Sequence, residues 1–236
     1  MQATDKYVEI NGIKTYCFTS RKQLIELAIM EKKCLLAVNA EKILHATPKS
    51  CSLFQKSIGF SDGIGAVWAL RKKGFKNAIK IPGCELWLDI IKAVNGSKSF
   101  YLVGSRQEVI EKTVEKLKKE FPKIRIVNFR NGYLSNEFER KDLLNDIVNR
   151  KPDVVFVAMG SPKQEEIIEE MQKVHPAVYQ GLGGSFDVYV GAVKRAPEWW
   201  VSHNLEWAYR LVRQPERIRR QIYLVKFAWM LVWGKL

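Results

Sequence analysis

The segment Gly160-Ser161-Pro162-Lys163-Gln164 has the residue types of a helix start that binds an anion. We predict that Ser161 is the N-cap, that Pro162 takes the first helical position and that Gln164 completes a capping box. The free N–H groups at a helix N-terminus carry a partial positive charge. Because Lys163 adds a full charge beside them, this segment is a candidate phosphate site.

Two further turns contain glycine. The turn at 104–108, which begins with Gly104, repeats the arrangement with an acidic cap, and a third turn lies at 181–187. In the third turn, Gly183 and Gly184 would let the backbone approach a ligand closely. Taken alone, each turn fits an ordinary helix cap as well as a ligand site. Together they favour a phosphate-bearing ligand, although none has the spacing of a P-loop or of the GxGxxG dinucleotide fingerprint.

Asp62 precedes Gly63 and Gly65 in the sequence FSDGIG, directly before an expected helix. At the rim of a ligand cleft, its carboxylate could take a proton from a sugar hydroxyl. Alternatively, Asp62 is the N-cap of the helix that follows. The spacing alone fits both interpretations.

The elements that must position these residues alternate between apolar runs and amphipathic patterns. We predict strands at 32–39, 78–81, 99–104, 123–128, 153–160 and 177–184. Helices are expected from near 40, from about 84, and at 105–121, 136–149 and 161–174. This alternation predicts the α/β class, with a Rossmann-like parallel sheet and flanking helices. Ligands of such sheets bind beyond the carboxyl ends of the strands.

The character of the chain changes near residue 192, so we expect a catalytic core at 1–192 and a C-terminal helical appendage at 193–236. The appendage has nine Lys and Arg against three Glu and holds five of the seven tryptophans. A basic, Trp-rich segment fits either a nucleic acid or an anionic membrane surface. Its apolar run at 227–233 has seven residues, too few for the ~20 that span a bilayer.

Four arginines of the appendage are spaced three, four and three residues apart, which would form one stripe on a helix: Arg210, Arg213, Arg217 and Arg220. They could bind phosphates in the active site. Alternatively, they bind anionic lipid while an apolar face meets the hydrocarbon, formed by Ile218, Ile222, Val225 and Trp229. A solvated basic face on a packed helix is the third possibility.

The composition limits other chemistries. The net charge of +14 calls for a polyanionic partner. The sequence has no Asp-x-Asp pair, no Gly-x-Ser-x-Gly elbow and only scattered histidines, so we expect no metal and no serine nucleophile. The four cysteines lack metal-ligand spacing and are expected to be reduced core thiols of a cytosolic protein: Cys17, Cys34, Cys51 and Cys84.

Taken in order, six segments resemble the WecG/TagA/CpsF glycosyltransferases, family 26, over nearly the whole chain. They are AVNAEK (37–42), SDGIGAVW (61–68), IPGCELW (81–87), VAMGSPKQE (157–165), GLGGSFDVYVGAVKRAP (181–197) and LEWAYRLVRQPERIRRQ (205–221). The appendage and AMGSPKQE look closest to the UDP-N-acetyl-D-mannosaminuronic acid transferases of enterobacterial common antigen synthesis. The teichoic-acid N-acetylmannosaminyltransferases look like a more distant branch.

The resemblance implies an inverting, metal-independent transfer from a UDP-sugar, with no cofactor. The implied acceptor is the GlcNAc of a polyprenyl-diphosphate-linked sugar (undecaprenyl-diphosphate-GlcNAc) at the cytoplasmic face of the membrane. The family's proposed general base matches Asp62, and its pocket asparagine and glutamine match Asn39 and Gln164. Lys80 stands where the family often has Arg, which keeps the charge but loses the bidentate fork.

On this basis we expect UDP to lie across the strand ends. Gly160, Ser161 and Lys163 would favour the diphosphate, and Asp187 could hydrogen-bond the ribose hydroxyls or merely cap the segment that follows. Tyr133 could stack on uracil or line the ribose, or it is a surface aromatic after an Asn-Gly turn.

Other interpretations remain open. The donor sugar is either the uronic acid or neutral N-acetylmannosamine, the latter in teichoic-acid-type, capsule or exopolysaccharide synthesis. A basic nucleic-acid-binding module shares the charge and the aromatic tail but lacks a known binding motif. A dinucleotide-dependent oxidoreductase lacks its glycine fingerprint. We expect a protein bound peripherally to the inner face of the cell membrane through its appendage, without nucleic acid. The sequence is compatible with a homo-oligomer.

Overall fold

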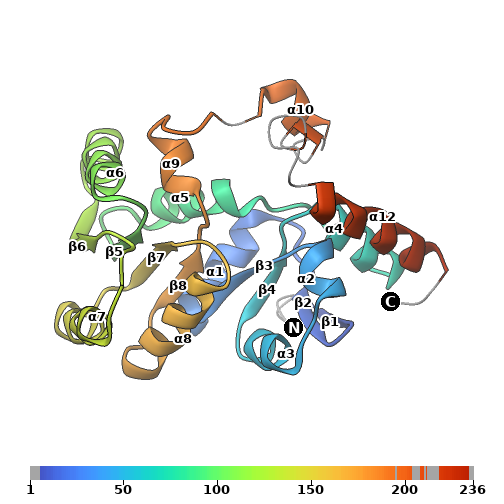
Figure 1. The fold of residues 1–236 in the computed structure, drawn as a ribbon, viewed down its shortest axis with the longest axis horizontal. Coiled ribbons are helices and arrows are strands. Elements are labelled where there is room, and N and C mark those ends of the chain that lie inside the picture. The colour runs from blue at the N-terminus through green and yellow to red at the C-terminus, as the bar shows by residue number, and fades with distance from the viewer. Residues whose placement is uncertain (1–5, 195, 204–207, 210, 212–217, 234–236) are drawn as a thin grey trace. The chain divides into compact units, whose positions relative to one another are not determined.

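The computed structural model describes residues 6–194, 196–203, 208, 209, 211 and 218–233. Within them lies a six-stranded parallel sheet in the order β4-β3-β8-β7-β5-β6 (Figure 1). Its strands are β3 (Cys34–Val38), β4 (Ile58–Ser61), β5 (Ser99–Gly104), β6 (Arg125–Arg130), β7 (Val154–Ala158) and β8 (Val178–Gly181). The prediction of an α/β fold with a Rossmann-like parallel sheet is confirmed.

The chain divides into two compact units. The described residues of Met1–Ser20, Ala37–Pro82 and Lys194–Leu236 form unit 1, and those of Arg21–Leu36 and Gly83–Val193 form unit 2. The functional residues expected from the sequence fall into both units.

Unit 2 has helices on both sides of its strands. They are α1 (Arg21–Glu31), α5 (Gly83–Val94), α6 (Gln107–Glu120), α7 (Glu137–Arg150), α8 (Lys163–Val174) and α9 (Ser185–Tyr189). Figure 1 shows α5, α6 and α9 on one side and α7 and α8 on the other. Every residue of β5 and β7 is buried, as expected for parallel strands covered on both faces. The indole of Trp87 meets the rings of Phe156 and Phe186 edge-on, at 5.7 and 5.6 Å between centroids.

Unit 1 begins with the antiparallel hairpin of β1 (Tyr7–Ile10) and β2 (Ile13–Tyr16). Asn11 and Gly12 both have positive φ, as a tight hairpin turn requires. The helices of this unit are α2 (Ala40–Leu44), α3 (Pro48–Gln55), α4 (Ile64–Lys72), α10 (Glu198–Ser202) and α12 (Ile218–Val232).

Helix α12 packs on α2 and α4. Phe227 is fully buried, and its ring lies 3.3 Å from the position that a Cβ on Gly65 would take. The ring of Tyr223 meets His45 edge-on at 4.3 Å. Helix α12 is therefore a packed part of unit 1. Among the described residues, no helix is both long enough and apolar enough to cross a bilayer.

Most predicted elements overlap an observed one, with one exception. Residues 78–81 were expected to form a strand, and this prediction is wrong because the segment has no continuous ladder. The N–H of Ile79 donates to Phe18 O (3.2 Å), whereas the N–H of Ile81 donates to Ser61 O (2.8 Å). The segment 78–81 therefore bonds to two separate segments of the chain, whereas a strand would bond to one neighbouring strand along its length.

Candidate functional site

In unit 2, the turn after β5 is packed tightly against β7. A Cβ on Gly104 would lie 2.3 Å from Ala158 O, and the φ angle of Gly104 is 132°. A side chain cannot fit there without displacing the neighbouring backbone. The glycine at this position is therefore required for strand packing, and Gly104 itself is buried.

The capping predicted for α8 is wrong. The N-cap is Pro162, α8 starts at Lys163, and no side chain caps the helix. Ser161 is exposed. The Gln164 side chain turns instead to the glycine-rich turn after β8, where its Oε1 accepts a hydrogen bond from the Gly183 N–H at 2.9 Å. Its amide also lies 2.6 Å from the position of a Cβ on Gly181, so that glycine makes room for Gln164.

The acidic cap predicted for α6 is also wrong. Arg106 is the N-cap, its side chain does not cap the helix, and Glu108 lies in the first turn of the helix. The side chain of the preceding residue bonds elsewhere: Ser105 Oγ donates to Asp187 Oδ2 at 2.9 Å. The sequence interpretation did not single out Ser105. The sequence pattern that could have pointed to Ser105 is its position directly after the glycine at the end of a strand.

Three glycines near these turns face open space. A Cβ on Gly160, Gly183 or Gly184 would meet no atom within 4 Å in the part of the chain that the structure describes. Lys163, at the start of α8, is exposed. Exposed backbone beside a helix N-terminus and a lysine is an arrangement that binds phosphate groups. The structure thus brings Gly160, Lys163, Gly183 and Gly184 to the carboxyl ends of β7 and β8.

In unit 1, Asn39 and Asp62 lie together at the ends of β3 and β4. The Asp62 N–H donates to Val38 O at 3.0 Å, and a Cβ on Gly63 would lie 3.5 Å from the Asn39 Cβ. Asn39 is the N-cap of α2, where its Oδ1 accepts from the Lys42 N–H at 2.9 Å. Helix α4 has Gly63 as its N-cap, so the alternative in which Asp62 caps this helix is wrong.

Lys80 lies on the segment that runs beside the end of β4. Its neighbours hold that segment in place: the Ile81 N–H donates to Ser61 O, and Ser61 Oγ donates to Ile79 O at 2.7 Å. Lys80 is half-buried. Unit 1 therefore places Lys80 on a segment paired with the residue that precedes Asp62.

The remaining predicted site residues lie apart from these groups or outside the described residues. Tyr133 follows β6 in unit 2 and is 60% exposed, with its N–H bonded to Asn131 Oδ1. Arg210, Arg213 and Arg217 lie outside the described residues. Arg220 lies in α12, but its side chain is outside the described part of the chain.

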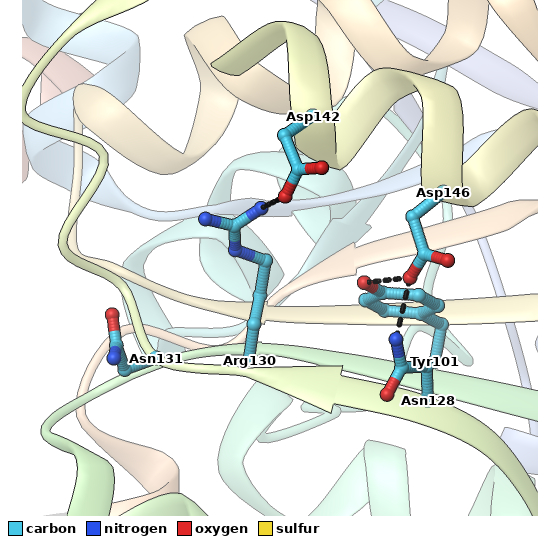
Figure 2. Close-up of a pocket in the computed structure, with 6 residues that line it drawn as sticks. All are labelled: Tyr101, Asn128, Arg130, Asn131, Asp142 and Asp146. Carbon is cyan, nitrogen blue, oxygen red and sulfur yellow. Dashed lines mark hydrogen bonds and ion pairs between the residues drawn. The ribbon is translucent and has the colours of Figure 1, made fainter. Parts of the chain in front are cut away.

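Figure 2 shows a polar pocket of about 330 Å³ in unit 2 that the sequence interpretation missed. It is lined by Tyr101, Asn128, Arg130, Asn131, Asp142 and Asp146. Asp146 Oδ2 accepts from Tyr101 Oη at 2.7 Å and from Asn128 Nδ2 at 2.6 Å. Burial, together with this carboxylate, raises the pKa of Tyr101.

On the other side of the pocket, Arg130 Nη1 lies 3.1 Å from Asp142 Oδ2. Most of the lining groups thus bond to one another and join β5 and β6 to α7, and none of them is a predicted site residue. The sequence signal was the polar alternation of Asn128 and Arg130, with two aspartates four residues apart on the next helix.

Two expectations concern cysteines and metals. All four cysteines are free, but only Cys34 is buried, so the prediction of core thiols is wrong for the other three, which are half-buried. Among the described residues, no three side chains of His, Cys, Asp or Glu are grouped so as to hold a metal ion.

A known protein family matches this chain over most of its length. The model of the family described as "Glycosyl transferase WecG/TagA/CpsF family" matches residues 8–236, which is almost the entire chain. The members of this family are glycosyltransferases that use a UDP-sugar and a lipid-linked acceptor. The chain belongs to the WecG/TagA/CpsF family of glycosyltransferases.

Proposed function

We propose that this protein transfers N-acetyl-D-mannosaminuronic acid from its UDP donor to undecaprenyl-diphosphate-linked GlcNAc, as in enterobacterial common antigen synthesis. The transfer is inverting and independent of metal. The observation that supports binding of the UDP donor is that Gly160, Gly183 and Gly184 face open space near Lys163, at the carboxyl ends of β7 and β8. Backbone N–H groups and an ammonium there would bind the diphosphate and stabilise it as it leaves.

The proposed base is Asp62 of unit 1. Its carboxylate takes the proton of the acceptor hydroxyl while that oxygen forms a bond to the anomeric carbon. The bond between the anomeric carbon and the diphosphate breaks, and UDP leaves with the electron pair. Asn39, which lies beside Asp62 and Gly63, is proposed to contact the substrates, and Lys80 is proposed to contact a donor phosphate or carboxylate. A positioned base typically supplies ~10²–10⁴-fold in rate.

Helix α12 supports the proposed membrane contact. Val225, Trp229 and Trp233 are four residues apart and are 72%, 52% and 66% exposed. Residues at this spacing share one helix face. The opposite side of α12 is anchored by the buried ring of Phe227. We propose that this tryptophan face rests in the headgroup region of the cytoplasmic leaflet, where the lipid-linked acceptor is found.

The first test is a donor comparison. The purified protein is incubated, without metal, with a short-chain polyprenyl-diphosphate-GlcNAc and either UDP-N-acetylmannosaminuronic acid or UDP-N-acetylmannosamine, and the products are weighed by mass spectrometry. Transfer of the uronic acid is the expected result. Transfer of the neutral sugar alone would assign the protein to the teichoic-acid-like branch, and transfer of neither would refute the proposed donor class.

The Asp62→Asn variant tests the base. We expect turnover to fall by ~10²–10⁴-fold while UDP affinity, measured by titration calorimetry, stays nearly unchanged. Asp142→Asn, which removes an exposed carboxylate in unit 2, is the matched control and should keep full turnover. Normal turnover of Asp62→Asn would show that another group accepts the proton.

The membrane contact is tested with Trp229→Glu and Trp233→Glu. Because both side chains are exposed, the variants should fold normally and yet lose flotation with vesicles that contain anionic phospholipid. The control is Phe138→Glu, since Phe138 is an aromatic residue of unit 2 that is 79% exposed. Equal flotation of the wild type and both tryptophan variants would refute the contact.

A further inference from the structure

Ser105 has a backbone conformation that side chains rarely adopt. It follows Gly104 at the end of β5 and has φ of 56°, in the left-handed region. For a residue other than glycine, such a conformation is strained and persists where the surroundings hold it. The contacts of Ser105 show what holds it.

Three hydrogen bonds tie Ser105 to three different segments of unit 2. Its N–H donates to Ala158 O at 2.8 Å, at the end of β7, and its carbonyl accepts from the Gly132 N–H at 2.9 Å, after β6. Its hydroxyl donates to Asp187 Oδ2 at 2.9 Å, in α9. Ser105 therefore fixes the end of β7 and the segments that follow β6 and β8 relative to one another.

The bond to Asp187 fixes the direction of a carboxylate that follows the glycine-rich turn. Among the described residues, the Asp187 carboxylate accepts one hydrogen bond, from the Ser105 hydroxyl to its Oδ2. Oδ1 can then accept from a ligand. The same turn is held from its other flank by Gln164, whose Oε1 bonds to the Gly183 N–H. Gly184, between these two fixed points, is exposed and faces open space.

We propose that Ser105 is a positioning residue that directs Asp187 to the vicinal hydroxyls of the donor ribose, so that the site selects ribonucleoside over deoxyribonucleoside diphosphates. This inference rests on the proposed function, because it takes the open turns of unit 2 as the diphosphate site. In nucleotide-binding α/β folds, a carboxylate at the same sheet edge as the phosphate turn accepts hydrogen bonds from ribose hydroxyls. A carboxylate held by a second side chain loses less freedom on binding than a mobile one.

The test compares the binding of UDP and 2′-deoxy-UDP by titration calorimetry in the full chain. The wild type should prefer UDP by about tenfold or more, as expected when a hydrogen bond to a charged group is lost. Ser105→Gly removes the hydroxyl and also relieves the left-handed backbone, so it should fold at least as well as the wild type. We expect it to lose most of the preference while its affinity for 2′-deoxy-UDP stays unchanged.

A second variant separates positioning from a general structural role. Asp187→Asn should also lose the preference, and the double variant Ser105→Gly/Asp187→Asn should show no further loss, because the two residues act through one contact. Ser97→Ala is the matched control, since it removes a serine hydroxyl that bonds to Val94 O at the end of α5. It should keep the wild-type preference.

The outcomes separate this inference from the proposed function. If UDP binds and the Ser105→Gly variant keeps the full preference for UDP over 2′-deoxy-UDP, the positioning role is overturned and the proposed function stands. If the wild type does not bind UDP, both are overturned.

Discussion

The neighbouring parallel strands β5 and β7 each have a Gly-Ser pair at or just after their carboxyl end, Gly104-Ser105 and Gly160-Ser161, but the two pairs differ in structure. After β5, Gly104 packs against the β7 backbone, and the hydroxyl of Ser105 bonds to Asp187. After β7, Gly160 faces open space and Ser161 is exposed. The Gly-Ser pair of β5 thus packs against other parts of unit 2, whereas the pair after β7 faces open space and solvent.

This difference shows that a glycine at a strand end can serve either packing or ligand access. At Gly104 the missing side chain makes room for protein atoms, whereas at Gly160 an added Cβ would meet no atom of the described residues within 4 Å. We infer that the β7 turn meets the diphosphate and that the β5 turn supports the groups around it. Three predictions test this division.

The largest effect is expected from adding a methyl group to each glycine. Gly104→Ala would place a Cβ 2.3 Å from Ala158 O, and we expect the unfolding free energy to fall by more than about 3 kcal/mol. Gly160→Ala meets no atom within 4 Å and should lose only about 1–2 kcal/mol, the cost of its positive φ, while UDP binding weakens.

Urea unfolding and UDP titration of both alanine variants measure the two effects. Similar unfolding free energies for the two variants would contradict the assignment of Gly104 to packing. Unchanged UDP affinity in Gly160→Ala would contradict the assignment of the β7 turn to the ligand.

An intermediate effect is expected from removing the charge beside the open turn. Lys163→Met should weaken UDP binding by about tenfold and reduce its salt dependence, because a hydrogen bond from an ammonium to a phosphate is lost. Stability should stay the same, since Lys163 is exposed. Lys112→Met, on the exposed face of α6, serves as the control and should bind UDP normally.

The sequence predicted the sheet well because hydrophobic runs determine where strands form. The run that became β7 is apolar throughout, the run that became β5 is apolar after Ser99, and every residue of both strands is buried. The segment at 78–81 had a similar pattern but no single neighbour to pair with, and periodicity does not report on pairing partners.

The site could be predicted only in part, because capping depends on which partner a side chain finds. The Gln164 side chain had two candidate hydrogen-bond partners, one nearby in a capping box and one distant, the Gly183 N–H. In the structure it bonds to the Gly183 N–H. Ser105 likewise bonds to a residue 82 positions away in the chain. Local spacing predicted turns at the ends of these strands, but not which of their side chains bond across the sheet edge.

The smallest effect concerns the opposite ends of the same two strands, where Asp153 precedes β7. Its carboxylate accepts from the N–H and the hydroxyl of Ser99, both at 2.9 Å, at the start of β5, and it lies 3.2 Å from Lys98 Nζ. Burial opposes ionisation, but these hydrogen bonds and the lysine outweigh it and hold the pKa of Asp153 below its ordinary value.

Because the folded-state pKa of Asp153 is lowered, its stabilisation is fully present above the unfolded pKa, near 3.8, and is lost as the pH falls through the folded pKa. We expect Asp153→Asn to be less stable than the wild type by about 1 kcal/mol at pH 7, and this difference to shrink below pH 3.8. Urea unfolding of both proteins across this range measures it. If the difference in unfolding free energy stays constant with pH, the contact acts through shape alone. If the difference shrinks at low pH, the charge of Asp153 holds β5 and β7 together at the ends away from the ligand turns.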